Sequence, residues 1–202
     1  MALSKIQAES INLADTFAFT GTVTGNSMDK LFAGSFSSNA DEYDISSTYI
    51  NSSFDNYYII GGFNVSSDNA SQNIRLRVFS SGSVLTGNVY GYESGAFAAS
   101  SYSNSNLTSY GAQLAHGDGI GSATGEGTSF SMHLLNVNST TKSAYWIGHA
   151  ATYYYNAGEP FNTQFGGQLI ASQYATVVNG LRFYPVSGQF TSGFVKVYGI
   201  KN

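Results

Sequence analysis

Short stretches in which apolar and polar residues alternate recur along the chain, and this feature constrains the fold more than any other. In the clearest case Ile74, Leu76 and Val78 alternate with Arg75 and Arg77. Successive side chains of a β-strand point to opposite faces, so this stretch predicts a strand with one buried and one solvent-facing side. A helix would need apolar residues at a spacing of 3.6, which the stretch does not have.

Similar stretches, separated by clusters of Gly, Ser and Asn that favour turns, extend from Thr16 to the C-terminus. The expected strands are residues 17–23, 30–36, 42–47, 56–65, 73–79, 88–93, 106–115, 128–137, 143–155, 165–172, 179–185 and 193–200. Many short strands without helical stretches between them favour a sandwich or barrel. We therefore expect an all-β, jelly-roll-like antiparallel two-sheet sandwich that forms a single domain over residues 16–202. Other two-sheet strand orders fit the same pattern.

Residues 1–15 differ from the rest of the chain. Their apolar residues, Leu3, Ile6, Ile11 and Leu13, follow neither strand nor helix spacing. We interpret residues 1–15 as an N-terminal attachment arm in which these four side chains are the anchor. The start of the chain lacks the apolar segment of a secretory signal, so we expect the protein to be made in the cytoplasm.

Composition excludes several classes of function. A net charge of −4, with Lys and Arg scattered singly, provides no basic surface for nucleic acid. The chain has no apolar run near the roughly 20 residues that a membrane-spanning helix needs. It contains no cysteine, which rules out disulfides, a thiolate nucleophile and cysteine-ligated zinc.

The sequence provides little support for catalysis or metal binding. Two groups of residues could in principle supply ligands: His116, Asp118, His133 and His149, and Asp41, Glu42, Asp44 and Asp68. Neither group has the spacing of a known metal or calcium motif, so we favour ordinary strand histidines and solvated acidic turns. The chain also lacks a G-x-S-x-G nucleophile motif. We expect no enzymatic activity, no cofactor and no bound metal.

Aromatic residues are the stronger candidates for a binding role. Tyr153, Tyr154 and Tyr155 are consecutive, and Tyr90 and Tyr92 alternate so that they share one face of a strand. A tyrosine ring can stack on a sugar or anchor a partner protein. Tyrosines also form cross-strand pairs that stabilise a sheet, which is the commoner outcome. We take these five tyrosines as candidate glycan or partner contacts.

Three segments resemble structural proteins of marine tailed phages such as cyanophages and pelagiphages. Residues 1–25, MALSKIQAESINLADTFAFTGTVTG, resemble the N-terminal segment of such proteins. Residues 42–82 resemble a β-module of virion proteins in which a polar turn leads into an R-L-R strand, here residues 75–77. Residues 181–202 resemble the last hairpin of that module and contain its closing Y-G-I-K, residues 198–201.

The resemblance implies a structural protein on the virion surface, with no family active site to transfer. Such modules occur in capsid decoration proteins and in tail or head fibres. Because this chain has no long shaft, we expect a decoration or cement protein that attaches to major capsid or tail proteins and stabilises the particle. Two stretches that are apolar on both faces, 57–60 and 194–200, predict a homo-oligomer, and we expect a trimer. The alternative is a fibre module that recognises host surface glycans.

Overall fold

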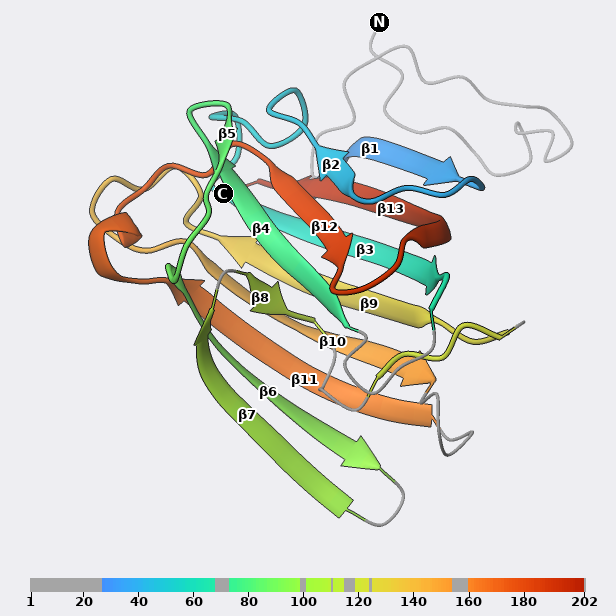
Figure 1. Ribbon diagram of the computed structural model, residues 1–202. Helices are drawn as coiled ribbons and strands as arrows, with labels where there is room; N and C mark the ends of the chain where they lie inside the picture. The colour runs from blue at the N-terminus through green and yellow to red at the C-terminus, as the bar shows by residue number, and fades with distance from the viewer. Residues whose placement is uncertain are drawn as a thin grey trace, which may run out of the picture.

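The computed structural model describes residues 27–67, 73–98, 101–109, 111–114, 119–123, 125–153 and 160–201. Within these ranges the chain forms β-strands and one turn of 3-10 helix at Ala171–Gln173 (Figure 1). The strands are β1 (Met28–Phe36), β2 (Tyr43–Ile45), β3 (Asn56–Val65), β4 (Ile74–Ser80), β5 (Ser83–Val84), β6 (Tyr90–Ala98), β7 (Ser101–Ser109), β8 (Ala112–Gln113), β9 (Thr128–Leu135), β10 (Tyr145–Tyr153), β11 (Pro160–Leu169), β12 (Leu181–Pro185) and β13 (Phe190–Ile200). The described residues include no helix that is long and apolar enough to cross a membrane.

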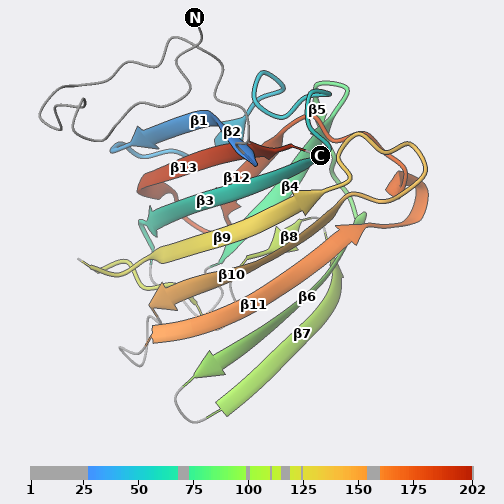
Figure 2. The same ribbon diagram turned by 180° about the vertical axis from the view of Figure 1, so that it is seen from behind.

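The strands form two antiparallel sheets. The larger has eight strands in the order β1-β13-β3-β9-β10-β11-β6-β7, and the smaller has the order β2-β12-β4-β5, with β8 also paired to β4. The smaller sheet lies across one face of the larger (Figure 1). Seen from behind, no strand of the described residues lies in front of the other face of the larger sheet (Figure 2). The predicted all-β antiparallel sandwich is confirmed.

Neighbouring strands come from distant parts of the sequence. The chain crosses between the sheets at each of the steps from β1 to β2, β2 to β3, β3 to β4, β8 to β9 and β12 to β13. As a result β1, at the start of the described chain, pairs with β13 at its end. The strands β10, β11, β6 and β7 extend the larger sheet beyond β9. This extension supplies most of the face that the smaller sheet leaves open.

The core lies between the two sheets and follows the alternation read from the sequence. Ile74, Leu76 and Val78 of β4 are fully buried, as are Leu181 and Phe183 of β12. Phe130, Met132 and Leu134 of β9 are buried with the same alternation. Phe63 is central to an aromatic cluster in which its ring stacks on Phe190 at 4.3 Å between centroids. The expected strand at 17–23 and the arm residues Leu3, Ile6, Ile11 and Leu13 lie outside the described residues.

Candidate functional site on the open face of the larger sheet

Strand β10 shows how the open face arises. Its residues alternate strictly between exposed and buried from Tyr145 to Thr152. Trp146, Gly148, Ala150 and Thr152 face the core, so the intervening residues face solvent. The outward residues are Tyr145, Ile147, His149, Ala151 and, at the end of the strand, Tyr153. They form a line along the middle of the open face.

The strand register places polar side chains on both sides of this line. His149 lies opposite Ser131 of β9 and opposite Gln164 of β11. In the same way Ala151 lies between Ser129 and Asn162. Further along, Tyr145 is paired with Gln168. The hydroxyls of Ser129 and Ser131 therefore border β10 on one side, followed by His133 and Leu135, and carboxamide groups border it on the other side.

Three pockets hollow this surface. The end pocket, of about 630 Å³, lies where β3, β9, β10 and β13 meet the 125–127 loop. The central pocket of about 430 Å³ shares Ser129, Ala151 and Phe194 with it. The side pocket of about 960 Å³ shares His149 and Gln164 with the central one. The pockets thus adjoin one another, and we call them together the open-face groove, whose axis is the outward line of β10 from Tyr145 to Tyr153.

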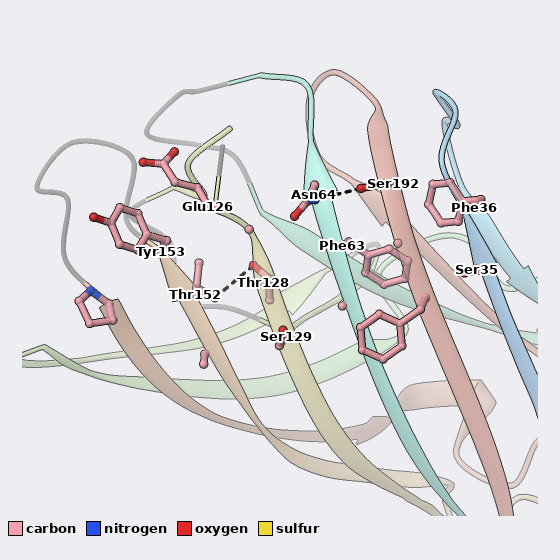
Figure 3. Close-up of a pocket in the computed structure, with 17 residues that line it drawn as sticks. Ser35, Phe36, Phe63, Asn64, Glu126, Thr128, Ser129, Thr152, Tyr153 and Ser192 are labelled. Carbon is pink, nitrogen blue, oxygen red and sulfur yellow. Dashed lines mark hydrogen bonds between the residues drawn. The ribbon is translucent and has the colours of Figure 1, made fainter. Parts of the chain in front are cut away.

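The end pocket has a polar rim and an aromatic side (Figure 3). The Asn64 carboxamide nitrogen donates a hydrogen bond of 2.9 Å to the Ser192 hydroxyl. The Glu126 carboxylate accepts a 2.8 Å hydrogen bond from the amide of Ala123, which holds this side chain at the rim. Tyr153 is held by its backbone, because its amide donates to Gly127 and its carbonyl accepts from Gly121. The pocket therefore combines an aromatic ring with amide, hydroxyl and carboxylate groups.

A row of aromatic side chains runs across the larger sheet toward the groove, starting on β13, the strand next to the β1 edge. Tyr198 of β13, Tyr58 of β3 and His133 of β9 occupy paired positions across three strands. The ring centroids of Tyr198 and Tyr58 are 6.4 Å apart, and those of Tyr58 and His133 are 5.0 Å apart. His133 is in turn opposite Ile147, on the groove axis. The sequence alone does not bring these three residues together, because they become neighbours only through strand pairing.

The middle of the open face is formally uncharged. The outward described residues of β3, β9, β10 and β11 include no Asp, Glu, Lys or Arg. Charged side chains flank this region instead, with Lys196 on β13 and Glu93 on β6. A partner that fits this surface would therefore itself be neutral along most of its length.

Two of the tyrosines proposed from the sequence are not surface residues. Tyr90 and Tyr92 are only 0% and 4% exposed because they lie on the inward side of β6. The Tyr90 hydroxyl donates to the Leu85 carbonyl at 2.8 Å and accepts from the Val78 amide at 3.1 Å. Burial raises the pKa of Tyr90 to about 12. The prediction that these tyrosines are exposed contacts is wrong.

The other proposed contacts have different outcomes. Tyr153 lines the end pocket of the groove, whereas Tyr154 and Tyr155 lie outside the described residues. Two histidines were considered as possible ligands together with His116. Of these, His149 is on the groove axis and His133 is in the aromatic row.

The acidic residues near β2 form ion pairs and hydrogen bonds with other side chains of the protein. The Arg182 guanidinium contacts Asp44 at 2.7 Å and Glu42 at 2.6 Å. The hydrogen bond to Asp44 raises the pKa of Arg182. The Asp41 carboxylate accepts a hydrogen bond from the Gln189 side chain at 2.8 Å. Among the described residues no group of three His, Asp or Glu side chains could hold a metal ion, and His116, Asp118 and Asp68 lie outside them.

Comparisons with known proteins give no family. No family model matches the chain, and no curated protein matches it significantly. One similar structure is an engineered GH43 glycoside hydrolase that displays both endo-xylanase and exo-arabinofuranosidase activity; it has 10% identity and a TM-score of 0.34 over 73% of this chain and 29% of that chain. Another is a Shewanella oneidensis MR-1 protein of unknown function, with 11% identity and a TM-score of 0.22 over 72% and 59% of the two chains. The chain spans less than two thirds of either structure, and neither similarity is close enough to indicate an activity.

Proposed function

We propose that this protein is a non-enzymatic surface protein of a tailed phage and that its open-face groove recognises neutral glycans of the host surface. The observation that carries this proposal is the groove itself. Its axis, from Tyr145 to Tyr153, is open to solvent and bordered by hydroxyl and carboxamide groups. No charged side chain of the described β3, β9, β10 or β11 residues points to this face.

These residue types suit carbohydrate chemistry. A sugar ring has an apolar C–H face and an edge of hydroxyl groups. Aromatic rings with a polar tip, such as Tyr145 and Tyr153, can cover the apolar face while remaining hydrated. The carboxamides of Asn162 and Gln164 each offer two donors and an acceptor, so that one side chain can bind neighbouring sugar hydroxyls. The absence of formal charge among the outward described residues of these central strands favours a neutral ligand.

The virion setting rests on the resemblance of residues 1–25, 42–82 and 181–202 to phage structural proteins. In this proposal residues 1–15 attach the chain to a capsid or tail protein, and the sandwich is displayed on the particle surface as a homo-oligomer, with a trimer as our prediction.

We also propose jelly-roll strand order for the sandwich. A jelly roll consists of two four-stranded sheets whose strands alternate along the chain as two Greek keys. Here β1-β13-β3-β9 faces β2-β12-β4-β8. Successive members of these two sets cross between the sheets, except β4 and β8, which pair with each other in the smaller sheet. Under this assignment β10, β11, β6 and β7 are additions to the first set. Jelly rolls occur in viral capsid proteins and in lectins, so this order is compatible with a glycan-binding virion protein.

Binding without hydrolysis agrees with the arrangement of carboxylates. Most glycosidases need two carboxyl groups about 5–10 Å apart on either side of the scissile bond. Among the described residues, Glu126 is the carboxylate that lines the end pocket and Glu93 is the one that lines the side pocket. The central pocket between them is lined by neither Asp nor Glu in that part of the chain.

The second candidate function is that of a capsid decoration protein whose open face packs against a neighbouring subunit. Two large apolar side chains on this face favour it, since Ile147 is 57% exposed and Phe194 is 38% exposed. Apolar side chains at such positions commonly mark protein interfaces. The same surface would then be buried in the particle and would not be free to bind glycans.

An array of purified capsular and O-antigen polysaccharides from marine bacteria, both neutral and acidic, separates the two candidates. We expect the full-length protein to bind at least one neutral polysaccharide. The double variant H149A/Q164A, which removes both residues shared by the central and side pockets, should bind at least about tenfold more weakly. The control Y174A removes a tyrosine that is 57% exposed but lies outside the groove, and it should bind normally. Binding to purified capsids without binding to any polysaccharide would establish the decoration role instead.

A further inference from the structure

We infer that the open-face groove binds an internal segment of a linear neutral polysaccharide, laid along β10, and not a single terminal sugar. The inference rests on the proposed glycan-binding function and adds to it the form and direction of the ligand.

The first argument is that the three pockets follow one another along β10. Every outward residue of β10 lines at least one of the three pockets. Ala151 joins the end pocket to the central pocket, and His149 joins the central pocket to the side pocket. A site for one sugar would instead be a single closed pocket with convergent polar groups.

The second argument is length. The outward line of β10 extends from Tyr145 to Tyr153, which at the rise of an antiparallel strand is about 27 Å. This distance is several times the width of one sugar ring. A monosaccharide could contact only one of the three pockets, so most of the groove would remain empty.

The third argument is the order of chemical groups along the axis. Aromatic or apolar side chains lie at both ends, with Tyr145 and Ile147 in the side pocket and Tyr153 in the end pocket. The central pocket places the polar side chains of Ser131, His149 and Gln164 between them, beside the apolar side chains of Ile60 and Phe194. A polymer presents C–H faces and hydroxyl groups repeatedly, so one chain can stack at both ends and donate hydrogen bonds in the middle.

The fourth argument is the position of the two carboxylates. Glu126 lies in the end pocket and Glu93 in the side pocket, while the described residues of the central pocket carry no carboxylate. An anionic polysaccharide spanning the groove would meet a negative charge at each end. An uncharged chain avoids this repulsion.

The test is a length series. A neutral polysaccharide bound on the array is partially hydrolysed, its fragments are separated by size, and the affinity of each fragment for the full-length protein is measured by calorimetry. We expect the affinity to rise by at least about tenfold from the monosaccharide to the longest fragment and then to reach a plateau. The variants Y145A and Y153A should each move the plateau to shorter fragments, because each removes one end of the groove. The control Y174A should leave the series unchanged.

The outcomes separate this inference from the function on which it rests. If a monosaccharide binds as tightly as the longest fragment, the protein binds glycans but not as an extended chain. If only acidic polysaccharides bind, the neutral ligand class is wrong. If no polysaccharide binds, both the inference and the proposed glycan-binding function are overturned.

Discussion

Glycine and an aromatic residue occupy directly paired positions at several places in the larger sheet. Phe63 is opposite Gly193, Phe130 opposite Gly61, Trp146 opposite Gly167 and Phe165 opposite Gly148. In each pair a Cβ built on the glycine would fall within 2.7 Å of the aromatic ring. The ring therefore occupies the space that a side chain would need. These glycines allow the core to hold large rings without separating the strands.

The adjacent glycines of β11 provide a test of this packing. A Cβ at Gly167 would lie 2.7 Å from the Trp146 ring and 2.5 Å from the backbone carbonyl oxygen of Gly91, whereas one at Gly166 would come no closer than 3.4 Å to any neighbour. We expect G167A to lower the free energy of unfolding by about 1–3 kcal/mol and G166A to change it by less than about 0.5 kcal/mol. Urea denaturation of both variants measures the difference. Equal stabilities would mean that the Trp146 ring does not require this glycine.

The raised pKa of Tyr90 predicts that the folded protein loses stability at alkaline pH. Its pKa is about 12 in the folded protein and about 10 in an unfolded chain. Because folding favours the neutral phenol, the stabilising contribution of Tyr90 is fully present below pH 10 and is lost as the pH rises to 12. The free energy of unfolding falls by about 2–3 kcal/mol in total. The pKa values of Tyr43 and Tyr57 are also raised by burial and act in the same direction.

Replacing Tyr90 by phenylalanine should lower stability at pH 8 but should make stability less sensitive to alkaline pH. At pH 8 we expect Y90F to be less stable by about 1–3 kcal/mol, since the Val78 amide loses its acceptor. Between pH 10 and 12 the variant should lose less stability than the wild type. Urea midpoints measured across this pH range check both effects, with Y174F as an exposed control. If the urea midpoint of Y90F fell with rising pH as steeply as that of the wild type, Tyr90 would not be the group that causes the alkaline loss of stability.

At the scale of the secondary-structure elements, β13 connects the end of the chain to the core. It pairs with β1 on one side and β3 on the other. Val195 and Val197 are fully buried toward the smaller sheet, and Lys196 between them is exposed. This closing strand is therefore central to the fold, although Phe194 on its outer face remains 38% exposed.

A charge at Val197 should prevent folding. An aspartate there would be buried without a partner, at a cost of several kcal/mol, which is comparable with the whole stability of a typical domain. We expect V197D to yield almost no soluble folded protein, whereas K196Q should change stability by less than about 0.5 kcal/mol. Thermal melting of purified protein compares the two variants. If V197D melted at the same temperature as K196Q, β13 would contribute little to the core.

Local sequence patterns predicted most strands because burial in a sandwich follows a period of two. The strand predicted at 56–65 coincides with β3, and the predicted buried side of residues 73–79, with Ile74, Leu76 and Val78, is the buried side of β4. The single strand predicted at 106–115 is instead the end of β7 and the short β8, because the chain leaves the larger sheet after Ser109 and joins the smaller one at Ala112. The beginning of β11 was missed because its first residues, from Pro160 to Gln164, are mostly polar and resemble a loop.

The candidate site was harder to predict than the strands. Tyr58, His133 and Tyr198 are far apart in the sequence and become neighbours only through the pairing of β9, β3 and β13. Alternation correctly placed Tyr90 and Tyr92 on one face of their strand, but it does not say which face is the core. That is decided by packing, since the Tyr92 hydroxyl reaches Gln113 of β8 in the opposing sheet.

At the scale of the whole molecule, the two sheets differ in size, and this difference creates the open face. The smaller sheet covers one side of an eight-stranded sheet, and within the described part of the chain no strand lies over the other side (Figure 2). The uncovered side is available either for a ligand or for a neighbouring subunit. The identity of that partner is therefore the central functional question for this fold.

Attachment to a particle would be a separate function of the chain. We predict that deletion of residues 1–15 leaves the sandwich folded, because these residues lack the alternation of the later strands. The truncated protein should melt cooperatively but fail to join phage particles in a co-sedimentation assay. Loss of cooperative melting would place the arm within the core. Normal incorporation would mean that another segment is the anchor.

The most direct test of the account is to map where a bound polysaccharide contacts the protein. Amide ¹H–¹⁵N shifts of the full-length protein would be recorded during titration with a neutral polysaccharide fragment selected on the array. The account predicts that the largest shift changes fall on β9, β10 and β11, from Tyr145 to Tyr153 along the groove axis and at its neighbours, and that β4 and β12 are unaffected. Shift changes concentrated on the smaller sheet, or no changes at saturating fragment, would contradict the assignment of the open face as the binding surface.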